Sequence, residues 1–156
     1  MTQQLSFAFD ILEQNRSNIY GILQRLSPEQ LNRIPEGFNN NLIWNAGHLV
    51  VTQQLLVHSL SGSEVLVSAD WIQRFRKGSR PDRQVSKSEI DQLLEALLEV
   101  PKTSRKMMND GKMKDTYSAY ETSFGTTLHS LDEAIPFNNI HEGMHFGAIL
   151  SLRKMV

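Results

Sequence analysis

Residues 41–61, NLIWNAGHLVVTQQLLVHSLS, decide the fold of this chain of 156 residues. If this stretch is drawn as a helix, apolar side chains point to almost every side of it and little polar face remains. Such a helix belongs at the centre of a bundle, and Ser61-Gly62 supplies a stop signal at its end. We therefore expect residues 41–61 to form the central helix of an all-α protein.

Another helix is predicted ahead of it over residues 5–26, where apolar residues recur at steps of three and four. It should end at Ser27-Pro28, because proline cannot extend a preceding helix. Ser27 as N-cap, Pro28 at the first helical position and Gln30 three residues after the cap predict a one-turn helix there. Residues 32–41 are then expected to be a loop.

The middle of the chain is less regular. A short helix is predicted over residues 69–77, within the long connection 62–86. A third long helix should open at Ser86 or Ser88, since a strong amphipathic stripe follows. Pro101 predicts a kink or an end within it.

The last helical region is expected in two pieces, residues 126–134 and 137–155, because Pro136 interrupts the pattern. Residues 112–124 alternate too irregularly for an assignment, and strand signals are nearly absent. Four long helices predict an all-α fold, a four-helix bundle with a long crossover connection, in one domain that spans residues 1–156.

The composition excludes several classes of site. The chain has no cysteine, which rules out disulfides, iron–sulfur clusters, thiolate zinc sites and catalytic thiols. Any metal must therefore be held by nitrogen and oxygen ligands. The sequence also lacks a signal-peptide pattern and an apolar run of about 18 residues, so we expect a cytoplasmic protein with no membrane partner.

The charge balance argues against a nucleic-acid partner. The formal net charge is −1, with 16 basic and 17 acidic residues, whereas nucleic-acid binders usually carry a basic surplus or stripe. The densest basic cluster lies in a stretch with glycine and proline, and we interpret it as a solvated loop face rather than a phosphate site. Its members are Arg74, Arg76, Lys77, Arg80 and Arg83.

The histidines carry the functional signal. His141 and His145 stand one helical turn apart and share a helix face with Phe137 and Ala148, so both imidazoles are expected to point inward. Two neutral imidazoles in this relation can chelate one cation. Five histidines also give such a pair by chance with appreciable frequency, so ordinary core histidines are the alternative interpretation.

The local string HEGMH, residues 141–145, matches the H-E-x-x-H motif of zinc proteases, in which the glutamate is the general base. Those enzymes take their third ligand downstream, and the remaining residues, FGAILSLRKMV, contain no histidine, aspartate or glutamate. A protease is therefore disfavoured. The third ligand must come from upstream.

His48, in the middle of the most apolar helix, is the best upstream candidate. Gly47 beside it weakens the helix by up to about 1 kcal/mol unless close packing or a nearby site compensates. His58 lies farther round the same helix and is expected outside the site, and His129 is expected to be a surface or capping residue. For His48, too, a satisfied core histidine is the alternative.

The sequence resembles the DinB-like superfamily of small helical metalloproteins. The motifs that carry the resemblance are W-x-x-G-H at residues 44–48, in the second long helix, and H-x-x-x-H-x-G at residues 141–147, in the last one. Residues 26–50, LSPEQLNRIPEGFNNNLIWNAGHLV, are similar to that family's S-x-E-x-L followed by an Asn-rich lead into the histidine helix. The resemblance covers about residues 5–155.

The resemblance implies a four-helix bundle with a crossover connection and a three-histidine site for zinc or nickel. His48, His141 and His145 match the metal positions of the family. The resemblance also implies homodimerisation, which is common to many members of the family. Some relatives are thiol S-transferases that join low-molecular-weight thiols to electrophiles, and others are isomerases or have no known activity. No catalytic residue beyond the triad carries over.

The leading hypothesis is a metal-dependent enzyme with a three-histidine divalent-metal site, acting on a small-molecule substrate as a thiol S-transferase or a hydrolase. Three neutral imidazoles leave at least one open position on the ion, which is the catalytic arrangement. Asn45, Thr52, Asn138 and Glu142 are candidate partners for the imidazole N–H groups. The alternatives are a non-catalytic metal-binding or dimerising bundle, and a plain helical interaction protein.

Overall fold

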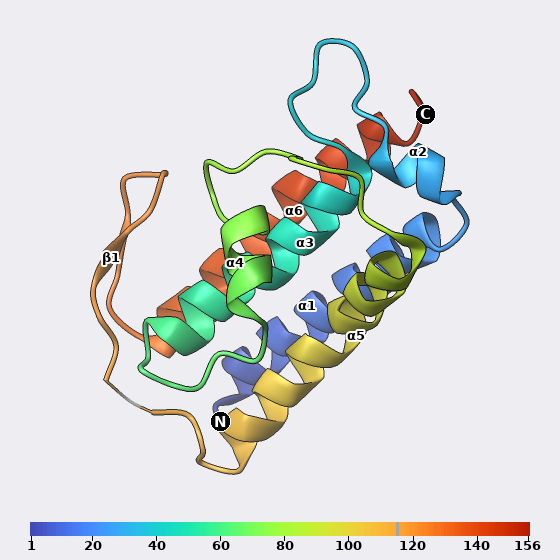
Figure 1. The fold of residues 1–156 in the computed structure, drawn as a ribbon. Coiled ribbons are helices and arrows are strands. Elements are labelled where there is room, and N and C mark those ends of the chain that lie inside the picture. The colour runs from blue at the N-terminus through green and yellow to red at the C-terminus, as the bar shows by residue number, and fades with distance from the viewer. Residues whose placement is uncertain (115) are drawn as a thin grey trace.

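The computed structural model describes residues 1–114 and 116–156, and this part of the chain is mostly helical, as expected (Figure 1). The elements are, in order, α1 (Gln3–Leu23), α2 (Pro28–Asn32), α3 (Leu42–Gln53), the π-helical segment η1 (Gln54–Ser59), α4 (Ala69–Phe75), α5 (Lys87–Asn109), β1 (Tyr120–Glu121), β2 (Thr127–Leu128) and α6 (Leu131–Leu152).

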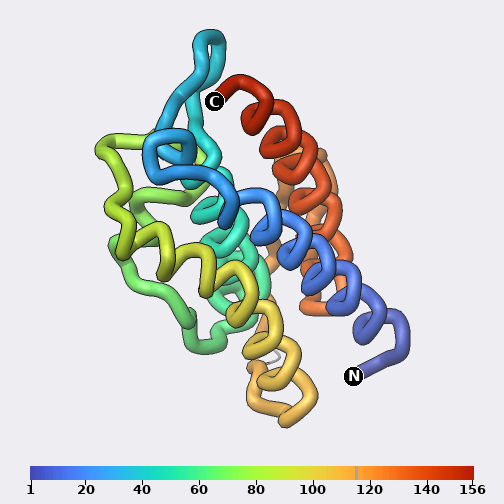
Figure 2. The backbone as a smooth tube through the Cα atoms, turned by 90° about the vertical axis from the view of Figure 1, so that its right-hand side faces the viewer, coloured from blue at the N-terminus to red at the C-terminus, as the bar shows by residue number. Residues whose placement is uncertain are grey.

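Four long helical segments make up most of the molecule: α1, α3 with η1, α5 and α6. Helix α1 packs against both α5 and α6, and α3 packs against the same two helices (Figures 1 and 2). The connection between η1 and α5 carries α4, which packs on α3. Every residue of α3 except Thr52 is buried, so the central position predicted for this helix is confirmed.

Side-chain caps fix where the helices begin. The backbone N–H of Gln30 donates to Ser27 Oγ, and the backbone N–H of Ser27 donates to Gln30 Oε1, which confirms the predicted start of α2. Ser86, rather than Ser88, caps α5 through the same reciprocal arrangement with Glu89.

Two prolines lie inside unbroken helices, so the break predicted at Pro136 is wrong. Pro136 lacks the N–H that would bond to the carbonyl of Asp132, but both residues are exposed near the start of α6, where water can satisfy that carbonyl. Pro101 is buried inside α5, and the packing of that helix against α1 and α3 offsets the missing hydrogen bond.

The helix predicted over residues 126–134 begins later than expected. Ser130 caps α6 by accepting a hydrogen bond from the backbone N–H of Glu133. The residues before this cap form β2, which pairs antiparallel with β1 so that Tyr120 lies opposite Leu128. The hairpin runs beside the first turns of α6 (Figure 1).

The stretch 112–124, for which no assignment was possible from the pattern, contains β1. Residue 115 within it lies outside the described residues. In the part of the chain that the structure describes, no helix has the length and apolar character needed to cross a membrane.

The helix predicted over residues 41–61 changes its winding halfway. In η1 the backbone N–H of Leu60 donates to the carbonyl of Leu55, five residues back. The N–H of Ser63 donates to the carbonyl of His58 in the same way. Stretches of π-helix are rare and occur frequently at functional sites.

Candidate metal centre

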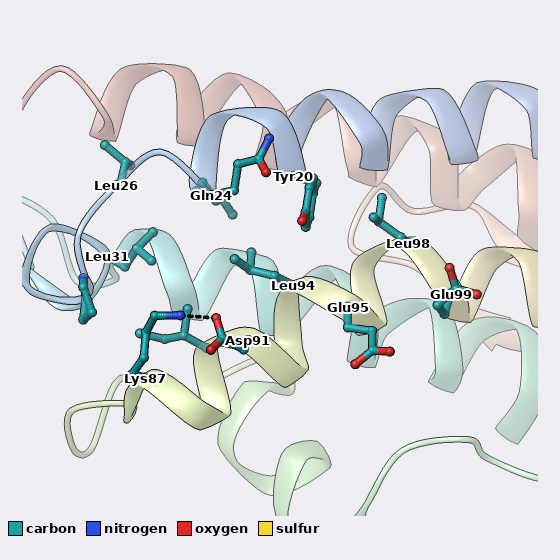
Figure 3. A pocket seen from close by; sticks show the side chains of 13 residues that line it. Tyr20, Gln24, Leu26, Leu31, Lys87, Asp91, Leu94, Glu95, Leu98 and Glu99 are labelled. Atoms are coloured by element: carbon teal, nitrogen blue, oxygen red, sulfur yellow. Dashed lines mark hydrogen bonds and ion pairs between the residues drawn. The ribbon is translucent and has the colours of Figure 1, made fainter.

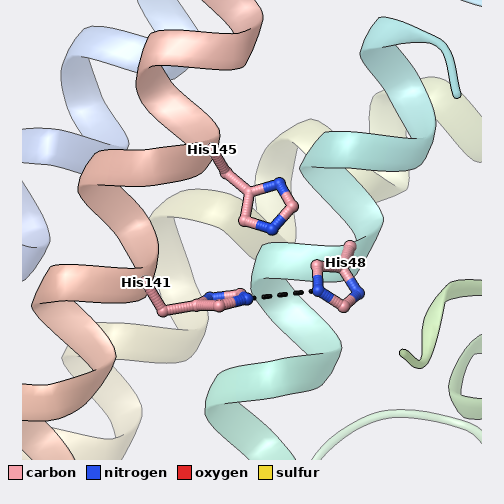
Figure 4. Close-up of side chains that lie close together, drawn as sticks. All are labelled: His48, His141 and His145. Atoms are coloured by element: carbon pink, nitrogen blue, oxygen red, sulfur yellow. Dashed lines mark hydrogen bonds between the residues drawn. The ribbon is translucent and has the colours of Figure 1, made fainter. Parts of the chain in front are cut away.

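Three histidines from two neighbouring helices meet at one point. His48 lies in the middle of α3, and His141 and His145 lie one turn apart on α6 (Figure 4). One ring nitrogen of each lies within 4.8 Å of the corresponding atoms of the other two. The structure thus brings together the three residues that the sequence singles out. Among the described residues, no second group of three or more possible ligands occurs.

Two of the imidazoles are oriented by acceptors behind them. His48 Nδ1 lies 2.6 Å from the carbonyl oxygen of Phe75, and His145 Nδ1 lies 2.8 Å from Asn45 Oδ1. Because these oxygens only accept, each Nδ1 carries the hydrogen and donates it. Each Nε2 therefore keeps a lone pair directed toward the common centre. This is the pattern of a metal-ligating histidine with an outer partner.

His141 has a different environment. Its Nδ1 is buried and has no hydrogen-bond partner within the described residues. Its Nε2 lies 3.2 Å from His48 Nε2. Unpaired buried polar atoms are uncommon in folded proteins and ask for an explanation. A set of three converging imidazole nitrogens, with no thiolate available, fits a divalent transition metal.

The environment keeps the three imidazoles neutral. Burial, with the neighbouring His145 and His48 and the charge of Arg16 adding to it, lowers the pKa of His141 to about 3. Burial together with His48 lowers the pKa of His145 to about 4. Burial also lowers the pKa of His48, although the bond to Phe75 opposes the effect. At neutral pH, therefore, no proton competes for the ligand nitrogens.

We expect the metal-free protein to lose stability as the pH falls from about 7 to 4. The unfolded chain titrates its histidines near pH 6.5. Below that pH the unfolded state binds more protons than the folded state, until the folded-state pKa values of about 4 and about 3 are reached.

Each such histidine contributes up to about 1.4 kcal/mol per pH unit. Urea unfolding at several pH values, for the parent and for His141→Gln, measures this slope. The free energy of unfolding should depend less steeply on pH in the variant than in the parent. Equal slopes would contradict a lowered pKa for His141.

The W-x-x-G-H motif builds the His48 side of the site. A Cβ atom at Gly47 would lie 2.6–2.8 Å from three ring carbons of Phe75, so glycine lets α4 approach α3 closely. This contact places the Phe75 carbonyl on His48. The Trp44 ring stacks on the His48 imidazole with centroids 4.7 Å apart, and its Nε1 donates to Ser79 Oγ. The loss of helix stability caused by Gly47 is thus compensated by close packing. Close packing and a nearby site were the two explanations that the sequence left open.

The glutamate of the HEGMH string does not face the metal centre. Glu142 is buried, and its two carboxylate oxygens accept hydrogen bonds of 2.7 Å from Nε and Nη2 of Arg16 on α1. The same Nη2 donates to the carbonyl of Leu49 on α3. A carboxylate held this way cannot act as the general base of a protease. Instead, Arg16 ties together the residues that directly follow His48 and His141.

The four candidate partners of the imidazoles behave differently. Asn45 binds His145, as described, and Thr52 Oγ1 lies 3.4 Å from His48 Nε2. Asn138 is buried beside Glu142, with Nδ2 3.4 Å from Oε1, and neither residue bonds to an imidazole. The outer partner of His48 is the backbone of Phe75. A backbone carbonyl has no sequence signal, so this partner could not be predicted.

The other two histidines lie outside the centre, as predicted. His58 is buried in η1, where its Nδ1 donates to the carbonyl of Glu64 and its Nε2 lies 2.7 Å from Ser104 Oγ. His129 is exposed ahead of α6, and its backbone N–H donates to Glu133.

The three histidines line a cavity of about 460 Å³, within the size range of small-molecule sites. The edge of the Phe124 ring, in the hairpin turn, meets the Phe137 ring of α6 with centroids 5.6 Å apart. The other lining residues come from α3, η1, α6, the hairpin and the stretch after α4. They are Thr52, Leu55, Leu56, Ser59, Leu60, Lys77, Tyr120, Thr122, Ser123, Phe124, Phe137 and Met144.

A second cavity, of about 360 Å³, lies between α1 and α5 (Figure 3). Leucines and Tyr20 line it together with Asp91, Glu95 and Glu99. It contains no histidine and is separate from the metal centre.

Two members of the basic cluster are paired with carboxylates: Arg74, near the end of α4, and Arg83, in the loop that follows. Arg74 and Arg83 both pair with Glu89, whose pKa is lowered chiefly by the hydrogen bond from Arg83. Arg74 also contacts Asp70. Arg74 belongs to a helix and its side chain is only 9 % exposed, so the prediction of a solvated loop face is wrong for this residue, whereas the other four members are exposed in the loop after α4. Lys77 differs from the other members because it lines the histidine cavity.

Comparisons with known proteins identify the family of the chain. A search of curated protein sequences finds no significant match. The family model of the DinB superfamily matches residues 11–149, a span that contains all three histidines and most of the helices that position them. On the strength of this match, which covers well over half of the chain, the protein belongs to the DinB superfamily.

Proposed function

We propose that the protein is a metal-dependent enzyme that binds one divalent ion, zinc or nickel, through His48, His141 and His145. One observation carries the proposal. Three neutral imidazoles converge on the wall of a cavity, and two of them have Nε2 freed for coordination by an acceptor on Nδ1. Ordinary core histidines would need hydrogen-bond partners for these nitrogens instead.

When bound, such an ion lowers the pKa of a coordinated thiol or water and so supplies a nucleophile at neutral pH. The side chains around it hold and orient the ligands. Phe75 and Asn45 keep the hydrogens of His48 and His145 on Nδ1, and Trp44 fixes the plane of the His48 ring. The apolar side chains of the hairpin and η1 line the cavity beside these ligands.

Of the two reactions considered, the cavity favours thiol S-transfer over hydrolysis. Among the described residues that line it there is no aspartate or glutamate to act as general base for water. A thiolate is already a strong nucleophile and needs no such base. We therefore propose that the substrate is a low-molecular-weight thiol, joined to an electrophile.

The proposal extends to the assembly. We propose one domain, a four-helix bundle with a crossover between η1 and α5, that acts in the cytoplasm as a homodimer. The side-by-side helices α1 and α6 expose Phe7, Ile11 and Ile140, which are suited to an interface between two copies (Figure 2). Sedimentation of the purified chain tests this part.

Metal analysis tests the site directly. After chelator treatment and reloading with zinc or nickel, the parent should hold about one ion per chain, and His145→Ala should hold none. His129→Ala is the matched control, because His129 is exposed and outside the centre. Equal metal content in the parent and in His145→Ala would refute the site.

Turnover separates an enzyme from a metal-stabilised bundle. The loaded protein should consume bacillithiol or glutathione in the presence of monochlorobimane, and the chelated protein and His145→Ala should not. If zinc raises the unfolding midpoint while no thiol or ester is consumed, the non-catalytic alternative holds instead.

A further inference from the structure

Much of the cavity beside the histidines is lined by apolar side chains. They come from η1 and the residue after it, from the hairpin and from α6: Leu55, Leu56, Leu60, Phe124, Phe137 and Met144. Phe124 and Met144 are about half exposed in the protein as it stands, 52 % and 54 %. Apolar side chains around an open cavity favour a ligand with an apolar body, because the contact removes both surfaces from water.

The same cavity is lined by a single charged residue of the part of the chain that the structure describes, and this residue is basic. Lys77 is this residue, and it makes no salt bridge with any described carboxylate. It follows Phe75, the residue that packs on Gly47, by two positions, and it is exposed to solvent.

From these two observations we propose that the cavity binds an amphipathic anion. Its aryl or alkyl body lies against Phe124, Phe137 and Met144, and its anionic group, such as a carboxylate, lies at Lys77. Lys77 is thus a specificity-determining residue that selects anions over neutral or cationic molecules of the same shape. This inference rests on the proposed function, since it names the class of ligand that the same site binds. The preference of Lys77 for anions, however, does not require the metal.

Three probes of one shape and different charge test the proposal: 4-phenylbutyrate, 4-phenylbutan-1-ol and 4-phenylbutylamine. Binding is measured by NMR titration of the full chain, both chelator-treated and zinc-loaded. The acid should bind at least about tenfold more tightly than the amine. Lys77→Met should weaken the acid by about three- to tenfold and leave the alcohol unchanged, as expected for one partly exposed charge pair. Lys87→Met, at the other cavity, is the matched control and should change nothing.

Phe124→Ala should weaken the acid and the alcohol by the same factor, because it removes only apolar contact. The proposal is overturned if the acid and the amine bind equally, if Lys77→Met has no effect on the acid, or if no probe binds at millimolar concentration.

The two zinc states separate this inference from the proposed function. A preference for the acid that appears only with zinc and survives Lys77→Met would mean that the metal holds the carboxylate, which overturns the role of Lys77 and supports the metal site. A Lys77-dependent preference in protein that never retains zinc would support the ligand class while the proposed function fails.

Discussion

Replacement of Glu142 by glutamine is expected to lower the free energy of unfolding by about 3–5 kcal/mol. In the folded protein the carboxylate accepts two hydrogen bonds of 2.7 Å from Arg16, and neither side chain has appreciable contact with water. The variant keeps the size of residue 142 but leaves the Arg16 guanidinium charged and unpaired in the interior. Urea unfolding at pH 7 measures the loss.

Two variants show whether charge is the cause. In Glu99→Gln the lost pair with Lys102 is exposed, so the change should be within about 1 kcal/mol. In the double variant Arg16→Met/Glu142→Leu both charges are gone, and most of the stability lost in Glu142→Gln should return. If the double variant were as unstable as Glu142→Gln, the unpaired charge would not be the explanation.

The second large effect is expected at Gly47. Alanine there places a Cβ within 2.8 Å of the Phe75 ring, and this ring is buried, so α4 must shift. Overpacking of this kind costs about 1–3 kcal/mol. The shift also moves the carbonyl that holds the His48 hydrogen, and loss of such an outer partner lowers metal affinity by about 10–100-fold.

Zinc titration against a competing chelator, together with urea unfolding, measures both effects. Gly143→Ala is the matched control. Gly143 lies between the two histidines of α6, but a Cβ there meets nothing within 4 Å, so alanine should be neutral or stabilising by up to about 1 kcal/mol. If Gly47→Ala bound zinc as tightly as Gly143→Ala, the docking of α4 would have no part in the site.

The sequence was sufficient where local periodicity governs the structure. The helix pair of His141 and His145 follows from a four-residue spacing, and the burial of α3 follows from its apolar character. The break predicted at Pro136 was wrong because the expectation that proline ends a helix takes no account of solvent exposure. Near the exposed start of a helix, water can bond to the carbonyl that proline leaves without a partner, so the missing hydrogen bond costs little stability. The predicted start at residue 126 lies too early, because Ser130 caps the helix and the apolar pattern before it belongs to β2.

The parts that could not be predicted depend on contacts between distant segments. Nothing near Glu142 indicates that its partner is Arg16, because a buried arginine within an amphipathic helix looks like a surface residue in the pattern. The Phe75 carbonyl has no side-chain signature at all. Gly47 was the one sign in the sequence of the contact between α4 and α3, since a glycine inside a buried helix indicates close approach by a neighbour.

Arg16 and Glu142 are 126 positions apart, and this separation sets the order of events during synthesis. When α1 leaves the ribosome, its guanidinium has no partner and must stay in water, so α1 cannot yet settle into its final place. The partner arrives only with α6, the same helix that brings His141 and His145. Long-range contacts of this kind form late. Of the three ligands, the nascent chain therefore presents only His48 at first, and the complete set exists only once the last helix has been made and packed.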